Sequence, residues 1–408
     1  MRASGPNFSI GDLPHQACPC CGALGMQSFY RVEQIPVHDC QLMPTREEAM
    51  GIPRGDLQLA SCKTCGFVMN TLFDAADLDY SSGYEETQGF SPTFSAFAKG
   101  LAQSAIERFD LRNKTILEIG CGKGEYLASL CALGENRGVG VDPAYVPERL
   151  PSELTDRLDF HQEFFQKKHM QCKPDFLCCR HTLEHVAEVA HFLNDIRQAI
   201  AESPGPRDIP LTFDLPDSKR IWTEGAFWDI FYEHCSYFSI GTLARLFRRC
   251  GFEVTSLHRE YDDQYLSLSA VPAETATQTK WTIERDQLDN RADILGFTQI
   301  CRRKIEGYRH RLGLLHQQGE RTVIWGGGSK GVSFLTTLGL QDEIVAAVDI
   351  NPFKQGKFMP GTGHPVVNPM DLQEIQPTQV ILMNPVYEVE IRKNMAELGL
   401  FPQVHPCT

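Results

Sequence analysis

Two glycine-rich turns in this chain contain the residue types that bind nucleotide-like ligands. The first is Glu118-Ile-Gly-Cys-Gly-Lys-Gly124, the second is Gly326-Gly-Gly-Ser-Lys-Gly331, and each follows a short apolar run. In both cases an acid ends the next apolar run, at Asp142 and at Asp349. Glycines let backbone N–H groups approach a ligand closely, and the acid can accept hydrogen bonds from ribose hydroxyls. The pattern predicts two βαβ units with nucleotide-type sites, a layout typical of an enzyme.

The spacing within the first turn indicates which cofactor it binds. Glu118, Gly120, Gly122 and Gly124 form Glu-x-Gly-x-Gly-x-Gly, whereas NAD-binding units more usually show Gly-x-Gly-x-x-Gly. The extra glycine and the preceding acid favour S-adenosylmethionine, whose methionine part would pass over a loop where a side chain would collide. We therefore predict a cofactor site that includes these four residues and Asp142, and the alternative is a tight turn with no ligand.

The second turn fits the dinucleotide pattern better. Gly326, Gly328 and Gly331 satisfy Gly-x-Gly-x-x-Gly, and Asp349 follows at the end of the next apolar run. By motif alone this predicts NAD, with a plain packing turn as the alternative.

Two cysteine pairs near the N-terminus have the spacing of a zinc site. Cys18 and Cys21 form one Cys-x-x-Cys pair, Cys62 and Cys65 form the other, and a glycine follows each pair. Four cysteines leave no open coordination position, so the predicted Zn²⁺ is structural rather than catalytic. Cys20 is an alternative ligand to Cys21, and chance pairing of free thiols is the alternative to a metal site.

Two histidine segments should lie near the cofactor. His181-Thr-Leu-Glu-His185 matches the His-x-x-Glu-His pattern of inverted zincins, but it directly follows an apolar strand, where a doubly wound sheet presents residues to its ligands. We therefore place His181 in the cofactor site rather than in a metalloprotease. His234 follows another strand, and a histidine there can accept a proton near neutral pH, with Glu233 to tune or orient it. A histidine satisfied within the core is the alternative.

Helices and strands alternate around these motifs. The expected helices span 91–109, 124–133, 189–201 and 242–250, and the expected strands span 115–119, 138–142, 175–179, 209–215, 252–257 and 265–271. This alternation predicts an α/β fold with a doubly wound sheet that seven strands would complete. Together with the first glycine turn, it predicts the Rossmann-like sheet of a class I methyltransferase.

Changes in composition divide the 408 residues into four parts. We expect a small zinc-binding domain over 1–85, a methyltransferase domain that binds S-adenosylmethionine over 86–272, a helical connector over 273–318 and a second Rossmann-like domain over 319–408. The formal net charge of −13 argues against a nucleic-acid partner. The absence of long apolar runs argues against a membrane span, and the thiols read as reduced, so we expect a cytoplasmic protein. The oligomeric state stays open, a monomer included.

The order of these motifs resembles the sugar C-methyltransferases of deoxysugar biosynthesis. The resemblance rests on the cysteine pairs, the first glycine turn, Tyr232-Glu-His-Cys-Ser-Tyr-Phe-Ser239 and the terminal Gly-Gly-Ser-Lys-Gly segment, and it covers nearly the whole chain. It implies a zinc-bearing domain, a central S-adenosylmethionine domain and a C-terminal Rossmann-like domain. It also implies a small-molecule substrate, a nucleotide-linked 4-keto-6-deoxy sugar that is methylated at C3.

The same resemblance implies roles for particular residues. His234 would be the base that removes the C3 proton, and Tyr84 or Tyr80 would be the tyrosine that the family places ahead of the central domain. Lys330 in the second glycine turn would face the substrate's diphosphate, whereas Lys354 and Lys357 are expected on a solvated loop. Methylation of an oxygen or nitrogen of a small natural product is one alternative function, and a nucleotide-sensing binding module is another.

Overall fold

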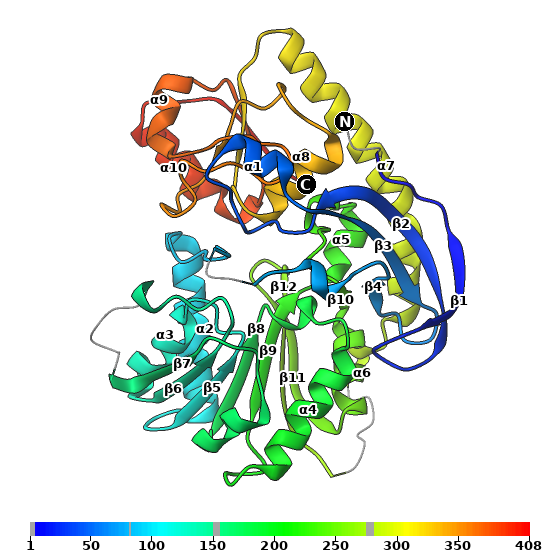
Figure 1. Cartoon of the computed structure of the whole chain (residues 1–408), viewed down its shortest axis with the longest axis vertical. Coiled ribbons are helices and arrows are strands. Elements are labelled where there is room, and N and C mark those ends of the chain that lie inside the picture. Colours follow the sequence, from blue (N-terminus) through cyan, green and yellow to red (C-terminus); the bar gives the residue numbers. More distant parts are fainter. Residues whose placement is uncertain (1–4, 81–82, 150–155, 275–280) are drawn as a thin grey trace.

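The protein is built on three β-sheets. The computed structural model describes residues 5–80, 83–149, 156–274 and 281–408. Figure 1 shows the central sheet with its helices, the antiparallel N-terminal sheet beside it, and the C-terminal α/β unit across from the edge of the central sheet.

The central sheet has seven strands in the order β11-β12-β9-β8-β5-β6-β7. These are β5 (Thr115–Ile119), β6 (Arg137–Val141), β7 (Leu158–His161), β8 (Phe176–Arg180), β9 (Leu211–Pro216), β11 (Phe252–Glu260) and β12 (Tyr265–Pro272). Six of them run in the same direction, and β12 is antiparallel to both of its neighbours. The doubly wound sheet expected from the sequence is therefore present, and β7 is the strand that the pattern left unplaced.

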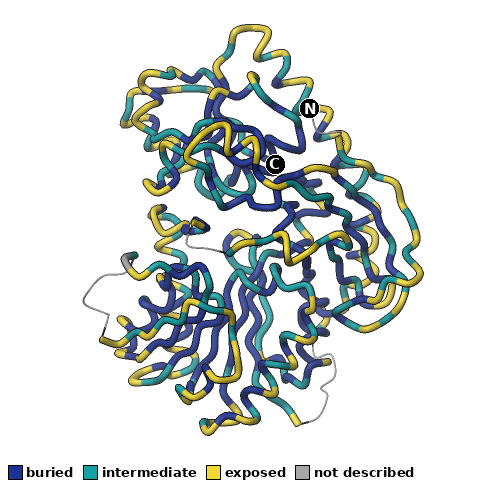
Figure 2. Tube along the Cα trace, in the orientation of Figure 1, coloured by how far each residue is buried: buried dark blue, intermediate teal, exposed yellow. Residues whose placement is uncertain are grey.

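Helices cover both faces of this sheet. They are α2 (Pro92–Phe109), α3 (Glu125–Gly134), α4 (Val189–Glu202) and α6 (Ile240–Arg249), whereas α5 (Ser218–Glu224) packs against the long C-terminal helix and the N-terminal sheet. Successive strand residues point to opposite faces, so Ile116 packs in the cluster with α2 and α3, while Leu117 packs with α4 and α6. Buried residues run along the central strands in Figure 2.

The N-terminal segment forms an antiparallel sheet that borrows a strand from the centre of the chain. Its own elements are β1 (Gly11–Ala17), β2 (Leu24–Pro36), α1 (Arg46–Gly51), β3 (Arg54–Cys62) and β4 (Val68–Asn70). The fifth strand is β10 (Ser236–Tyr237), which pairs with β4 through Ser236 opposite Met69 and Tyr237 opposite Val68. The N-terminal sheet and the central region thus share backbone hydrogen bonds.

The C-terminal unit is a small parallel sheet reached through one long helix. The long helix α7 (Gln287–Gln317) lies in the segment for which a helical connector is expected, and residues 275–280 lie outside the described part. The sheet has the order β15-β14-β13-β16-β17. Its elements are β13 (Thr322–Trp325), α8 (Ser329–Leu338), β14 (Ala347–Val348), β15 (Val366–Val367), α9 (Leu372–Ile375), β16 (Gln379–Leu382), α10 (Glu388–Glu397) and β17 (Gln403–Pro406).

One aromatic core joins the three parts. The ring of Phe29 in β2 lies 5.5 Å from Trp222 in α5 and 6.0 Å from Phe297 in α7. Phe227 stacks on Phe334 of α8 at 5.9 Å. Burial of such large rings contributes strongly to stability, so this core holds the sheets in a fixed relation. Among the described helices, none has the length and apolarity needed to cross a bilayer.

Candidate functional site

A cavity of about 900 Å³ lies between the central sheet and the C-terminal unit. Both glycine turns line it, and so do the carboxyl ends of β5, β6 and β8. Ligands of open α/β sheets bind at this edge, where the strand order reverses. The cavity is therefore the candidate functional site.

The first glycine turn has a backbone that glycine favours. Gly120 has φ +69° and Gly122 has φ +52°, values in the left-handed region. A Cβ at Gly120 would collide with the Thr182 side chain, and one at Gly122 would lie 2.6 Å from Oε1 of Glu86. Gly124, also left-handed, caps the start of α3. Side chains here would thus collide with the protein's own groups.

Asp142 fixes the geometry of the first turn. Its Oδ2 accepts from the N–H of Gly122 at 2.8 Å, and its Oδ1 accepts from the N–H of Ala144 at 2.7 Å. Burial raises the pKa of this carboxyl, while the two N–H groups oppose that rise. Each oxygen keeps a second lone pair, so the carboxylate can still accept from the hydroxyls of a ribose.

The second turn repeats this arrangement. Oδ2 of Asp349 accepts from the N–H of Gly327 at 2.9 Å, and its Oδ1 accepts from the N–H of Asn351 at 2.9 Å. Lys354 is buried with its Nζ 3.6 Å from Oδ2 of Asp349. The expectation of a solvated Lys354 is therefore wrong, because this carboxylate compensates the buried ammonium. Lys330 lines the cavity and pairs with Asp229.

Glu118 and His181 lie at the ends of two neighbouring strands and line the cavity. Burial raises the pKa of Glu118 to about 8, although the guanidinium of Arg180 acts in the opposite sense. His181 has a left-handed backbone with φ +48°, and its Nδ1 lies 3.5 Å from Oε1 of Glu184. Glu118 and His181, both expected in the cofactor site, thus line the same cavity.

His234 lies in a cluster of ring side chains on the cavity wall. Its ring centroid is 4.0 Å from that of Phe231 and 4.8 Å from that of His185. Burial, followed by the nearby His185, His181 and Lys330, holds the pKa of His234 well below its usual value. The imidazole is therefore neutral at neutral pH and has a lone pair that can accept a proton.

The His-x-x-Glu-His motif does not assemble as an inverted zincin would. Two residues of the motif, Glu184 and His185, instead converge with His234, with ligand atoms within 4.8 Å of one another, and His181 is not part of this group. The Nδ1 of His185 instead lies 3.1 Å from the hydroxyl of Tyr80. Tyr80 thereby connects this cluster to Tyr84, whose ring centroid is 5.4 Å away.

Glu233 faces the N-terminal part of the chain. Its Oε2 accepts from the hydroxyl of Tyr84 at 2.6 Å, and its Oε1 accepts from the backbone N–H of Asp39 at 3.0 Å. Both oxygens are thus bonded away from His234, and this arrangement does not match the orienting contact expected. The neighbouring Tyr232 donates to Asp77 at 2.7 Å, outside the cavity wall.

Comparison with known proteins gives two family matches and one full-length relative. A methyltransferase domain model matches residues 94–257, and a C-methyltransferase C-terminal domain model matches residues 270–400. C-methyltransferase NovU of Streptomyces niveus is 23% identical over 94% of this chain and 93% of its own. The chain combines a methyltransferase domain with a C-methyltransferase C-terminal domain and is an S-adenosylmethionine-dependent methyltransferase.

Solved methyltransferases resemble part of this C-methyltransferase. The 1,6-didemethyltoxoflavin-N1-methyltransferase of Burkholderia thailandensis is 19% identical, with 43% of this chain and 79% of that chain covered and a TM-score of 0.34. Magnesium protoporphyrin IX methyltransferase of Synechocystis PCC 6803 is 14% identical, with 44% and 84% covered and a TM-score of 0.34.

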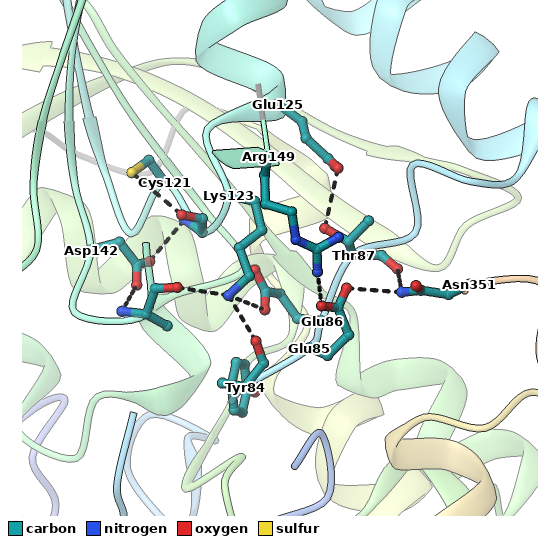
Figure 3. A network of polar contacts seen from close by, with 12 residues as sticks. Tyr84, Glu85, Glu86, Thr87, Cys121, Lys123, Glu125, Asp142, Arg149 and Asn351 are labelled. Carbon is teal, nitrogen blue, oxygen red and sulfur yellow. Dashed lines mark hydrogen bonds and ion pairs between the residues drawn. The ribbon is translucent and has the colours of Figure 1, made fainter. Parts of the chain in front are cut away.

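The C-methyltransferase also has site residues that the motifs did not reveal. Nζ of Lys123 donates to the carbonyl oxygens of Tyr84 and Ala144, each at 2.7 Å. Glu85 pairs with Arg149, and its Oε1 accepts from Nδ2 of Asn351 at 2.8 Å. Figure 3 shows these groups linking the 84–87 segment to the first glycine turn and to Asn351, which lies behind the second. Lys123 sits inside the glycine motif, which was the one sequence signal for this network.

The cysteine pairs of the C-methyltransferase converge on one point. Cys18, Cys21, Cys62 and Cys65 have sulfurs within 4.8 Å of one another, with Sγ–Sγ distances of 3.7 Å between Cys18 and Cys65 and 3.6 Å between Cys21 and Cys62. Tetrahedral zinc with Zn–S bonds of about 2.3 Å separates sulfurs by about 3.8 Å, so the group fits this ion. Cys21 rather than Cys20 belongs to the group. All fifteen cysteines are free thiols, as expected.

Proposed function

We propose that this C-methyltransferase removes a proton from a carbon beside a ketone and methylates that carbon, with His234 as the base. The observation that carries the proposal is the neutral imidazole of His234 on the wall of a cavity that both glycine turns line. A carbon acid needs such a base, whereas methylation of an amine or a phenol does not depend on a C–H proton.

The cofactor contributes an electrophilic methyl group, and the chain's own residues do the rest. Asp142 and the Glu118 to Gly124 turn would hold the cofactor, and His181 is a further candidate. His234 would take the proton at a ring nitrogen. A hydrogen-bond donor must stabilise the enolate oxygen of the resulting carbanion.

The substrate we propose is a nucleotide-linked 4-keto-6-deoxy sugar methylated at C3. Lys330 and Arg220, which both pair with Asp229, line the cavity near the second glycine turn, and α8 begins there. The positive end of a helix and nearby cations suit a diphosphate. The second turn would then hold the substrate rather than a second cofactor. We also propose a structural Zn²⁺ on the four clustered cysteines, remote from the chemistry.

Proton exchange tests the role of His234. Incubating the enzyme with a 4-keto-6-deoxy sugar nucleotide in deuterated water should place deuterium at C3, as detected by NMR, and addition of the methyl donor should give a C3-methyl product. His234→Ala should lose exchange by about a hundredfold or more and keep binding of S-adenosylhomocysteine by calorimetry.

A matched control is His191→Ala on α4, where the side chain is exposed and lies outside the cavity. This variant should exchange like the unmodified enzyme. Exchange that persists in His234→Ala would show that another group is the base. Methyl transfer to the sugar without any exchange would support methylation at oxygen or nitrogen instead.

A further inference from the structure

Two buried carboxyl groups meet at the junction of the N-terminal part and the cavity wall. Asp39 and Glu233 are 2% and 0% exposed, and the backbone N–H of Asp39 donates to Oε1 of Glu233 at 3.0 Å, so the two buried carboxyl groups lie close together. Two ionised carboxylates cannot share a dry site, because their repulsion is hardly screened there. One of the two must therefore hold a proton.

The donors around Glu233 identify it as the ionised partner. Its oxygens accept from the Tyr84 hydroxyl at 2.6 Å and from the N–H of Asp39 at 3.0 Å. The ring of His38 adds a third donor, with Nδ1 at 3.4 Å from Oε1. Nδ1 is the protonated nitrogen, because Nε2 accepts from the N–H of Asp79 at 3.1 Å. Three donors stabilise a carboxylate over the neutral acid.

Asp39 has the opposite surroundings. Among the described residues, no hydrogen-bond donor reaches either of its buried carboxyl oxygens by ordinary geometry, although the weakly donating thiol of Cys40 lies beside it. Burial, and then the charge of Glu233, raises the pKa of Asp39 far above its usual value. Tyr80, Tyr84 and Lys354 are further titratable groups around this junction, through their interactions with Asp39 or Cys40.

We propose that Asp39 is a positioning residue that stays protonated and donates its proton to Glu233, so that Glu233 remains a carboxylate and holds the hydroxyl of Tyr84. The single proton of Tyr84 is then committed to Glu233. The phenol oxygen can only accept hydrogen bonds on the cavity side, and it would receive a hydroxyl of the substrate. Tyr84 is accordingly excluded as the donor to the enolate oxygen.

This assignment rests on the proposed carbanion chemistry for its substrate, but the protonation of Asp39 can be measured without substrate. The infrared spectrum of the unmodified enzyme minus that of Asp39→Asn should show the band of a protonated carboxylic acid, because the variant lacks this group. Carbon-13 at the side-chain carboxyl of aspartate should shift this band, whereas the same label in glutamate should not. Asp56→Asn, on a partly exposed carboxylate that pairs with Arg31, is the matched control and should leave the band in place.

Activity provides the second readout. The asparagine side chain keeps an N–H donor for Glu233 but cannot ionise. The rate of C3 proton exchange in Asp39→Asn should therefore stay within about threefold of that of the unmodified enzyme. Asp39→Leu, which has a similar shape but no donor, should lose about ten- to hundredfold, since a buried charge then lacks a partner.

Three outcomes would overturn the assignment: no band that Asp39→Asn removes, a band that shifts only with labelled glutamate, or equal loss of exchange in the asparagine and leucine variants. If the band behaves as expected but the unmodified enzyme exchanges no proton, the proposed reaction fails while the protonated Asp39 stands.

Discussion

Nζ of Lys123 lies 2.7 Å from the carbonyl oxygen of Tyr84, so the first glycine turn is tied directly to the segment that carries a site tyrosine. The ammonium is buried, and its other close partners are the carbonyl of Ala144 and, at 3.5 Å, a carboxylate oxygen of Glu86. The two glycine turns consequently share one support, because the adjacent Glu85 bonds to Asn351 behind the second turn.

Replacing Lys123 by methionine should weaken this support. The apolar chain fills similar space but leaves two buried carbonyls without a donor, so the free energy of unfolding should fall by roughly 1–3 kcal/mol. Urea unfolding measures this change. Lys99→Met, at an exposed position of α2, is the control and should stay within about 0.5 kcal/mol of the unmodified protein. Equal stabilities of the two variants would contradict the role given to Lys123.

The aspartates behind the two glycine turns should separate the two ligands. Asp142→Asn should weaken S-adenosylhomocysteine binding by about tenfold or more, because it removes a charged acceptor for ribose hydroxyls, and should spare binding of a nucleoside diphosphate. Asp349→Asn should do the reverse. Calorimetry with each ligand and each variant tests this pair. Loss of both ligands in one variant would mean that the turns do not bind independently.

Glu118 should make stability depend on pH. Burial raises the pKa of the Glu118 carboxyl to about 8 in the folded protein, whereas the ordinary pKa of a glutamate side chain is 4.5. The unfolded state therefore loses this proton first, and the contribution is fully present below about pH 4.5 and is lost as pH rises to about 8.

Glu118→Gln should remove this fall, so the difference in unfolding free energy between about pH 5 and pH 8 should shrink. Urea titrations without cofactor at both pH values provide the measurement. Glu107→Gln, in the exposed part of α2, is the control and should leave the difference unchanged. An unaltered pH dependence in Glu118→Gln would show that this carboxyl is already ionised.

The cysteine cluster predicts different effects for adjacent residues. Cys21→Ala should lose bound zinc, as measured by elemental analysis of purified protein, and should lower the melting temperature. Cys20→Ala should keep the metal, because its sulfur lies outside the converging group. A zinc-free unmodified protein, or metal retained in Cys21→Ala, would argue against the proposed ligand set.

Sequence patterns predicted most of the central sheet because most of its strands can be identified from a short run of neighbouring residues alone. β5 and β8 are short, mostly apolar runs followed by glycine or histidine turns, and they form within a residue of the expected bounds. β7 has only four residues, Leu158–His161, in which polar and apolar types alternate, so it gave no distinct signal. The N-terminal strands were hidden because turns and cysteines break their apolar pattern.

The site was less predictable because its contacts join distant segments. The bond between Tyr84 and Glu233, and the burial of Lys354, depend on how the N-terminal part and the C-terminal unit pack against the centre. Neither the Tyr84–Glu233 hydrogen bond nor the burial of Lys354 can be inferred from the spacing of residues within one segment. The predicted domain limits, the cytoplasmic location and the substrate stay predictions.

The pairing of β10 with β4 has a consequence for building hybrid enzymes. Ser236 and Tyr237 follow His234 almost directly in the sequence. They nevertheless form the edge strand of the N-terminal sheet, in which β3 ends at Cys62. In a chimera that takes only residues 1–85 from a relative, the relative's β4 would have to pair with this protein's own β10, next to the proposed base His234. The exchangeable unit is discontinuous in the gene, and recombination between relatives must carry both pieces together.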